Sequence, residues 1–201
     1  KAPSNGELEG YGLNDYVSEV VVTPRSSLIG QTLRSSEIQR KFDVDVLELI
    51  RDGSRFPQPV ADKKLLAGDI LLVRGRRADL LNIRDERGLD IVPAVKFGQQ
   101  DLEAQLDSGE EEIAEVLILS NPRLAGSKLK EMRFRQLYNA TVLAVRRGED
   151  LLRERLGRIP LKFGDLLLVQ GPKESFKGLQ TSRELLVMEP QDIETLRPEK
   201  A

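Results

Sequence analysis

One eight-residue stretch occurs twice in this chain with almost no change. GDILLVRG begins at Gly68 and GDLLLVQG begins at Gly164, 96 positions further on. The same offset aligns glycine, charged and apolar residues elsewhere: Glu19 with Glu115, Gly30 with Gly126, Val46 with Val142, Arg51 with Arg147 and Leu89 with Leu185. Agreement of this kind at a single offset indicates an internal duplication. We therefore expect two similar units rather than one larger core.

The repeat sets the boundaries of the predicted domains. The first copy covers residues 15–93 and the second covers residues 112–190. The segment between them, residues 94–111, is polar and acid-rich, as is typical of a linker. Units of about 80 residues are small for a free-standing core. We therefore expect the copies to pair with each other as an internal pseudo-dimer, or with a second chain as a homodimer.

Each copy has the pattern of a small α+β domain. In the first copy, β-rich runs occur at 17–24 and at 43–53, the second ending at a glycine turn. A helix candidate between them has Leu33, Ile38 and Phe42 on its apolar side. A Gly-Asp pair then forms a turn and leads into an apolar run that is short enough for a strand covered on both faces. A second helix and a last strand complete the copy. This predicts a mixed or antiparallel sheet of about five strands with about two helices in each copy.

The composition excludes several classes of function. The chain has no Cys and no His, which removes thiol nucleophiles, thiolate metal sites, imidazole bases and Ser-His-Asp triads. Its 31 basic and 33 acidic residues give a net charge of -2, so electrostatics offer no reason to expect nucleic acid as a partner. Neither of the two common glycine-rich phosphate-binding motifs occurs, and no apolar run reaches transmembrane length. We predict a non-catalytic protein, and the sequence names no cofactor.

Two acidic features could suggest chemistry, and a simpler interpretation is favoured for both. Asp69 and Asp165 repeat like a pair of catalytic acids, but a turn explains the repetition because Asp bonds nearby backbone N–H groups. The acidic cluster Gly109–Glu112 could attract a divalent cation, but it lies in the predicted linker and not on a shaped loop. We therefore predict no catalytic residue and no metal site.

Arginines at the ends of predicted strands are the candidate ligand-binding residues. Arg51 ends the run LELIR, and Arg146 and Arg147 end the run VLAVRR, in each case just before a glycine turn. Guanidinium groups suit phosphate and carboxylate, which they bind through two parallel hydrogen bonds. The alternative is that these arginines are exposed or held in salt bridges. The copies also differ here, because Ile50 stands at the position of Arg146.

The order of these motifs resembles the C-terminal domain of the regulators of potassium conductance, the RCK-C or TrkA-C domain. SSLIGQTLR, VLELIRDG and LLAGDILLVRG carry the resemblance in the first copy, and RLAGSKLKEM, VLAVRRGED and LKFGDLLLVQG carry it in the second. The resemblance covers nearly the whole chain apart from the linker and the ends. It implies two tandem domains of this fold. It also implies a small ligand, a nucleotide or an ion, because some relatives bind such ligands between paired domains.

The tandem arrangement, without a Rossmann-type partner domain, is most similar to the pair found in divalent-anion/sodium symporters, the sulfate or dicarboxylate carriers. In those transporters the pair lies in a cytosolic loop between transmembrane helices. The resemblance implies a regulatory, ligand-sensing module at the cytoplasmic face of the membrane, with the transmembrane part of the same transporter as its partner. The alternative is a structural dimerisation module without a small ligand, including one of the aspartate–alanine exchanger type.

Overall fold

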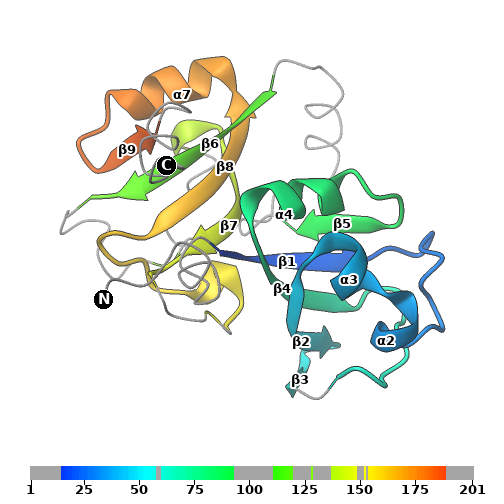
Figure 1. The fold of residues 1–201 in the computed structure, drawn as a ribbon. Helices are drawn as coiled ribbons and strands as arrows, with labels where there is room; N and C mark the ends of the chain where they lie inside the picture. Colours follow the sequence, from blue (N-terminus) through cyan, green and yellow to red (C-terminus); the bar gives the residue numbers. More distant parts are fainter. Residues whose placement is uncertain are drawn as a thin grey trace, which may run out of the picture. The chain divides into compact units, whose positions relative to one another are not determined.

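Each copy of the repeat forms an antiparallel β-sheet, and helices accompany both sheets (Figure 1). The computed structural model describes residues 15–57, 60–92, 111–119, 128, 137–148, 152 and 154–188 of the chain. The main division between the two compact units of the chain falls between Val92 and Pro93. The α+β class expected from the sequence is confirmed.

The first sheet contains five strands. In chain order they are β1 (Tyr16–Val22), β2 (Asp45–Arg51), β3 (Ser54–Pro57), β4 (Ile70–Gly75) and β5 (Leu89–Val92). Antiparallel pairing gives the order β3-β2-β4-β1-β5, so β4 is hydrogen-bonded on both edges. The second half of the repeated stretch is therefore a central strand, as its apolar sequence predicts.

The second sheet repeats this order with the strands that the structure describes. They are β6 (Glu111–Ile118), β7 (Thr141–Arg146), β8 (Leu166–Pro172) and β9 (Leu185–Met188), in the order β7-β8-β6-β9. Strand β8 takes the central place that β4 holds in the first copy. In both copies the register shifts by one residue on the strand beside the centre, between Val46 and Glu48 and between Val142 and Ala144. The duplication thus extends to a β-bulge.

The Gly-Asp pair forms the turn that precedes each central strand. Gly68 and Gly164 both have φ of +86°, a conformation that costs a residue with a side chain about 1–2 kcal/mol. The glycine that closes each stretch is needed for space instead. A Cβ at Gly75 would lie 2.7 Å from Cγ1 of Val44, and one at Gly171 would lie 3.1 Å from the carbonyl oxygen of Asn139. The two glycines of the repeated stretch therefore have different roles.

The helix expected after β1 is broken into two short pieces, α2 (Leu33–Ser36) and α3 (Ile38–Phe42). Glu37 separates them because it adopts a left-handed conformation with φ of +55°, and its N–H donates to the carbonyl oxygen of Arg34. The predicted apolar side is confirmed, since Leu33, Ile38 and Phe42 are all buried. The first copy therefore has three helices with α4 (Arg77–Arg84), where two were expected.

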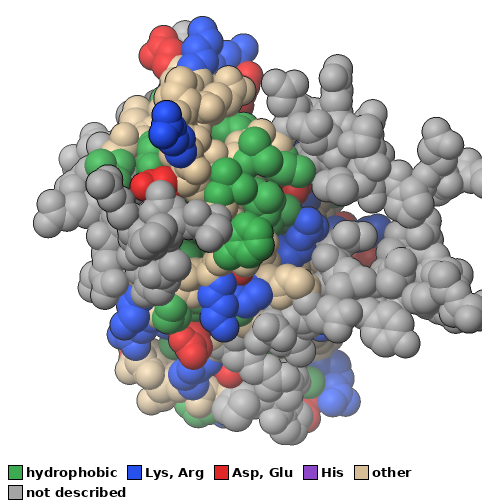
Figure 2. All heavy atoms as spheres, turned by 90° about the vertical axis from the view of Figure 1, so that its left-hand side faces the viewer, with side chains coloured by type: hydrophobic (Ala, Val, Ile, Leu, Met, Phe, Trp, Pro, Cys, Tyr) green, Lys and Arg blue, Asp and Glu red, His purple; other side chains and the backbone are tan. Residues whose placement is uncertain are grey.

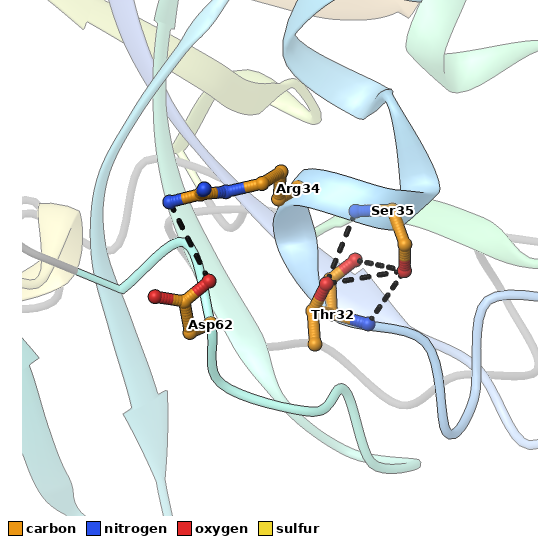
Figure 3. A network of polar contacts seen from close by, with 4 residues as sticks. All are labelled: Thr32, Arg34, Ser35 and Asp62. Atoms are coloured by element: carbon orange, nitrogen blue, oxygen red, sulfur yellow. Dashed lines mark hydrogen bonds and ion pairs between the residues drawn. The ribbon is translucent and has the colours of Figure 1, made fainter.

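A capping box starts α2 (Figure 3). The Thr32 hydroxyl accepts from the Ser35 N–H at 3.1 Å, and the Ser35 hydroxyl accepts from the Thr32 N–H at 3.0 Å. This exchange satisfies two backbone donors that a helix start would otherwise leave without partners. Arg34 of the same turn reaches Asp62 at 3.5 Å, but both side chains are exposed, so this ion pair contributes little to stability.

The later helix of each copy packs on the last strand of its sheet. Helix α4 contacts β5 and buries Leu80 and Ile83, and helix α7 (Lys173–Gln180) contacts β8 and β9 and buries Phe176 and Leu179. The central strands are covered on both faces: Leu71, Leu72, Val73, Leu167, Leu168 and Val169 are each at most 1% exposed. This burial confirms that the repeated apolar run is the middle of each core.

Parts of the second copy lie outside the described residues. The linker at 94–110 and most of the counterpart of α2 and α3, expected around 129–138, fall there. A 3₁₀ helix, η1 (Leu156–Arg158), precedes the turn at Gly164. None of the helices that the structure describes is long and apolar enough to cross a membrane.

Candidate functional site

The carboxylate of Asp69 is held by an arginine from the neighbouring strand. Arg51, the last residue of β2, donates from Nε to Oδ1 of Asp69 at 2.7 Å and from Nη2 to Oδ2 at 2.8 Å. Arg51 Nη2 also donates to the carbonyl oxygen of Lys64 at 2.8 Å, and the Leu66 N–H donates to Asp69 Oδ2 at 2.8 Å. We call these four groups the Arg–Asp clasp. It joins the end of β2 to the loop before β4.

The second copy contains the same clasp at the 96-residue offset. Arg147 donates to the two carboxylate oxygens of Asp165 at 2.8 and 2.6 Å and to the carbonyl oxygen of Pro160 at 2.8 Å. The Lys162 N–H completes it at 2.8 Å. The duplication therefore preserves a side-chain network bond for bond, although the residues that supply the backbone groups differ.

The two partners of each clasp differ in solvent exposure. The side chains of Asp69 and Asp165 are each 1% exposed, whereas those of Arg51 and Arg147 are 27% and 16% exposed. A buried carboxylate is tolerated only with a cation and hydrogen bonds. The hydrogen bond to Asp69 is the main cause that raises the pKa of Arg51 above its ordinary value, against the opposing effect of burial. The clasp is thus a fixed ion pair.

The candidate ligand residues fall into two kinds. Arg51 and Arg147 lie in the clasps, which matches the salt-bridge alternative, and the bonds of Arg51 to its partners use Nε and Nη2. Arg146 instead ends β7 opposite Leu166 and is half-buried, while its counterpart Ile50 lies opposite Ile70 and is buried. The structure thus separates Arg146 from the duplicated pair.

The sequence interpretation identified Asp69 and Asp165 as turn residues and missed their arginine partners. The turn role is correct, because each carboxylate accepts a backbone N–H three residues before it. The signal that could have revealed the pairing is the shared offset, since Arg51 and Asp69 recur together as Arg147 and Asp165. Among the described residues, no three acidic side chains gather as a metal site would require.

Comparison with known families places both copies in one family. The TrkA-C domain matches residues 17–88 and again residues 113–181, which together are more than half of the chain. The chain belongs to the TrkA-C domain family. The two matches each include one Arg–Asp clasp. Membership of this regulatory family makes the TrkA-C pair non-enzymatic, as the missing His and Cys led us to expect.

Several curated relatives are named as transporters. An uncharacterized transporter of Synechocystis is 63% identical over 193 residues, which are 95% of the chain and 32% of the relative. The uncharacterized transporter YfbS of Escherichia coli is 28% identical over 82% of the chain and 27% of the relative. A Chlamydomonas reinhardtii protein whose name links it to the response to sulfur deprivation is 26% identical over 85% of the chain and 30% of its own length. The chain spans about a third of the length of these relatives.

Two solved structures illustrate the distant likenesses. The RCK C domain of the potassium transport protein KtrA, in complex with cyclic diadenosine monophosphate, is 20% identical with a TM-score of 0.32, over 39% of this chain and 94% of that one. The GsuK channel is 13% identical with a TM-score of 0.34, over 82% of this chain and 52% of that one. Likenesses of this size say nothing about a ligand of the TrkA-C pair.

Proposed function

We propose that the TrkA-C pair is the regulatory, ligand-sensing module of a membrane transporter, and that this transporter is a sodium-coupled divalent-anion symporter of the sulfate type. The observation that carries the proposal is the match over 95% of the chain to about a third of a protein named as a transporter. The remaining two thirds of such a relative would be the membrane part. The relative named for sulfur deprivation supports sulfate as the transported anion.

The module acts by binding rather than by chemistry. A small ligand, a nucleotide or an ion, that binds one arrangement of the module more tightly shifts the population of that arrangement. The transmembrane part of the same polypeptide is the partner that receives this shift, and the module lies at the cytoplasmic face of the membrane. Arg51, Arg146 and Arg147 are the candidates for holding an anionic ligand. Arg51 and Arg147 each already bind a carboxylate in a clasp.

The transport half of the proposal is tested in a bacterial strain that lacks its own sulfate uptake. Expression of the full-length protein should restore sodium-dependent uptake of labelled sulfate. Exchange of aspartate for alanine without sulfate uptake would instead support an exchanger. The matched control is the same protein with the membrane part intact and residues 15–190 deleted. The uptake by the intact protein decides this half. If the intact protein takes up no sulfate, the sulfate symporter is refuted, whatever the deleted form does.

The ligand-sensing half is tested by thermal unfolding of the chain with candidate ligands. The panel contains nucleotides, cyclic dinucleotides, sulfate and divalent cations. A ligand at about 100 times its Kd stabilises the folded state by about 2.7 kcal/mol, which is a readily measured rise in melting temperature. A panel in which no compound raises the melting temperature would favour the alternative, a structural dimerisation module without a small ligand.

A further inference from the structure

One carboxylate that repeats in both copies lies on a sheet face among apolar side chains. In the second copy this residue is Glu115 of β6, which is directly opposite Met188 of β9, while Leu117 is opposite Leu186. Opposed residues of antiparallel strands share a face, and so do residues two apart on one strand. Glu115, Leu117, Leu186 and Met188 therefore lie on the same face, and we call them the β6–β9 patch.

The β6–β9 patch is open to solvent at its rim and closed at its acidic centre. Leu186 is 47% exposed, Leu117 and Met188 are half-buried, and Glu115 is 5% exposed. Figure 2 shows hydrophobic side chains gathered side by side on one face of the molecule, with basic side chains beside them. The exposed apolar surface of the patch is therefore centred on Leu186.

The first copy has the same carboxylate in different surroundings. Glu19 corresponds to Glu115 and is 2% exposed, and it has an interaction partner. Opposite Val21, the position that corresponds to Leu186 is held by Asp90. A charged residue at an exposed position of an outer strand discourages association there. The duplication has thus kept the carboxylate and two apolar neighbours, Val21 and Val92, in the first copy, but Asp90 stands there in place of the exposed Leu186.

Glu115 lacks a cation among the residues that the structure describes. No hydrogen bond or ion pair joins it to any described side chain, whereas the neighbouring Glu111 accepts a hydrogen bond from Gln170 at 2.6 Å. Leu168, which is directly opposite Glu115 on β8, is fully buried and apolar. A carboxylate with so little solvent contact is costly unless a positive group reaches it. The chemistry of a matching partner follows from this: one basic side chain with apolar residues around it.

We propose that the β6–β9 patch is a docking site for an apolar segment that carries one Lys or Arg, and that this segment belongs to the part of the same polypeptide outside these 201 residues. The basic side chain would reach Glu115, and the apolar residues would cover Leu186 and Met188. Charge complementarity selects the chemistry of the segment. The source rests on the proposed function, since the chain spans 32% of the transporter that it matches at 63% identity.

Site-specific photo-crosslinking in the full-length protein tests the docking. A benzophenone amino acid replaces Leu186 in one variant and Leu66 of the first copy in the control, because these two leucines are 47% and 45% exposed. The variant at position 186 should crosslink within its own polypeptide, to a segment outside the TrkA-C pair in which a Lys or Arg lies among apolar residues. The control should not reach that segment. Equal crosslinking from both positions, or an adduct of twice the mass from a second copy, would overturn the proposal.

Charge removal tests the role of the carboxylate. Glu115→Gln should lower the yield of the crosslink from position 186 at least about tenfold, as is usual when one partner of a buried charge pair is removed. Glu112→Gln on the same strand is the control, because Glu112 is exposed and 3.7 Å from Lys173, and it should leave the yield unchanged. Equal losses from the two variants would refute a role for Glu115.

A second variant keeps the test decisive if Glu115→Gln fails to fold. In this variant Leu186→Asp is combined with the photoreactive group at position 188. Aspartate is the residue of the first copy at the corresponding position, Asp90. The exposed site should tolerate it, and the crosslink should disappear; an unchanged crosslink would contradict docking. Sulfate uptake is read on the same preparations. Uptake without the crosslink refutes docking alone, and the crosslink without uptake refutes only the transported anion.

Discussion

Removing the arginine of an Arg–Asp clasp should cost more stability than removing its aspartate. In Arg51→Met the carboxylate of Asp69 stays in a site where it is 1% exposed and loses its cation. Uncompensated buried charges of this kind cost about 3–5 kcal/mol. In Asp69→Asn the arginine, whose side chain is 27% exposed, can hydrate, and the amide oxygen can still accept the Leu66 N–H. The expected cost is then about 1–3 kcal/mol.

Urea unfolding followed by far-ultraviolet circular dichroism measures both variants against the unmodified chain. At about 4–8 °C per kcal/mol for a unit of this size, Arg51→Met should also lower the melting temperature of the first copy by at least about 12 °C. The double variant should cost less than the sum of the two single costs, because each single change already removes the same ion pair. Arg147→Met provides an independent repetition in the second copy.

Two results would refute this account of the clasp. The first is a cost below about 1 kcal/mol for Arg51→Met, since the median value of an exposed ion pair is in that range. The second is a larger cost for Asp69→Asn than for Arg51→Met. If Arg51→Met leaves stability unchanged and abolishes binding of an anionic ligand, the arginine serves the ligand and not the clasp.

Three further changes have outcomes that the geometry fixes. Gly88→Ala should destabilise the protein by more than Gly164→Ala, as urea unfolding would measure. Both glycines have φ near +90°, and this backbone strain alone costs alanine about 1–2 kcal/mol. A Cβ at Gly88 would also lie 2.7 Å from Cα of Ser26, whereas one at Gly164 would meet nothing within 4 Å. Thr32→Ala should cost about 0.5–2 kcal/mol through the lost cap of α2, and equal unfolding midpoints for the variant and the unmodified chain would contradict it. Burial raises the pKa of Asp15 above its ordinary value of 3.8, so the contribution of Asp15 to stability is present below pH 3.8 and is lost as the pH rises through the raised pKa. Asp15→Asn should flatten this part of the plot of unfolding free energy against pH, and an unchanged slope would count against the shift.

The central strands were predictable from the sequence because the duplication presents the same apolar pattern twice. The apolar runs of β4 and β8 match at every position but one, and both are buried on both faces. A glycine turn was expected after β2, and Asp52 and Gly53 have the positive φ values of 51° and 80° that a tight hairpin between β2 and β3 requires. Local sequence and tertiary packing therefore agree at these places.

The broken helix was not predictable from its apolar spacing. Leu33, Ile38 and Phe42 would suit one continuous helix, and the residue that interrupts it, Glu37, is an ordinary helix former. Its left-handed conformation follows from the tertiary structure and has no signature in the sequence. Propensity is a weak preference that the packing of a short segment readily overrides.

The clasp shows a different limit of the sequence. Arg51 and Asp69 are 18 positions apart, and they meet because β2 and β4 pair with Ile50 opposite Ile70. This register depends on the β-bulge between Val46 and Glu48, and a shift of one residue would move a side chain to the other face. The repeat shows that both residues recur, and only the register shows that they bond.

Sulfate uptake by vesicles that contain the full-length protein tests the central claim most directly. The initial rate is measured with and without the ligand that stabilises the TrkA-C pair, for the intact protein and for the form that lacks residues 15–190. The account predicts sodium-dependent sulfate uptake whose rate changes with the ligand in the intact protein and does not respond to the ligand in the deleted form. A rate that is insensitive to the ligand in the intact protein, or the same response in both forms, would contradict a regulatory role for the pair.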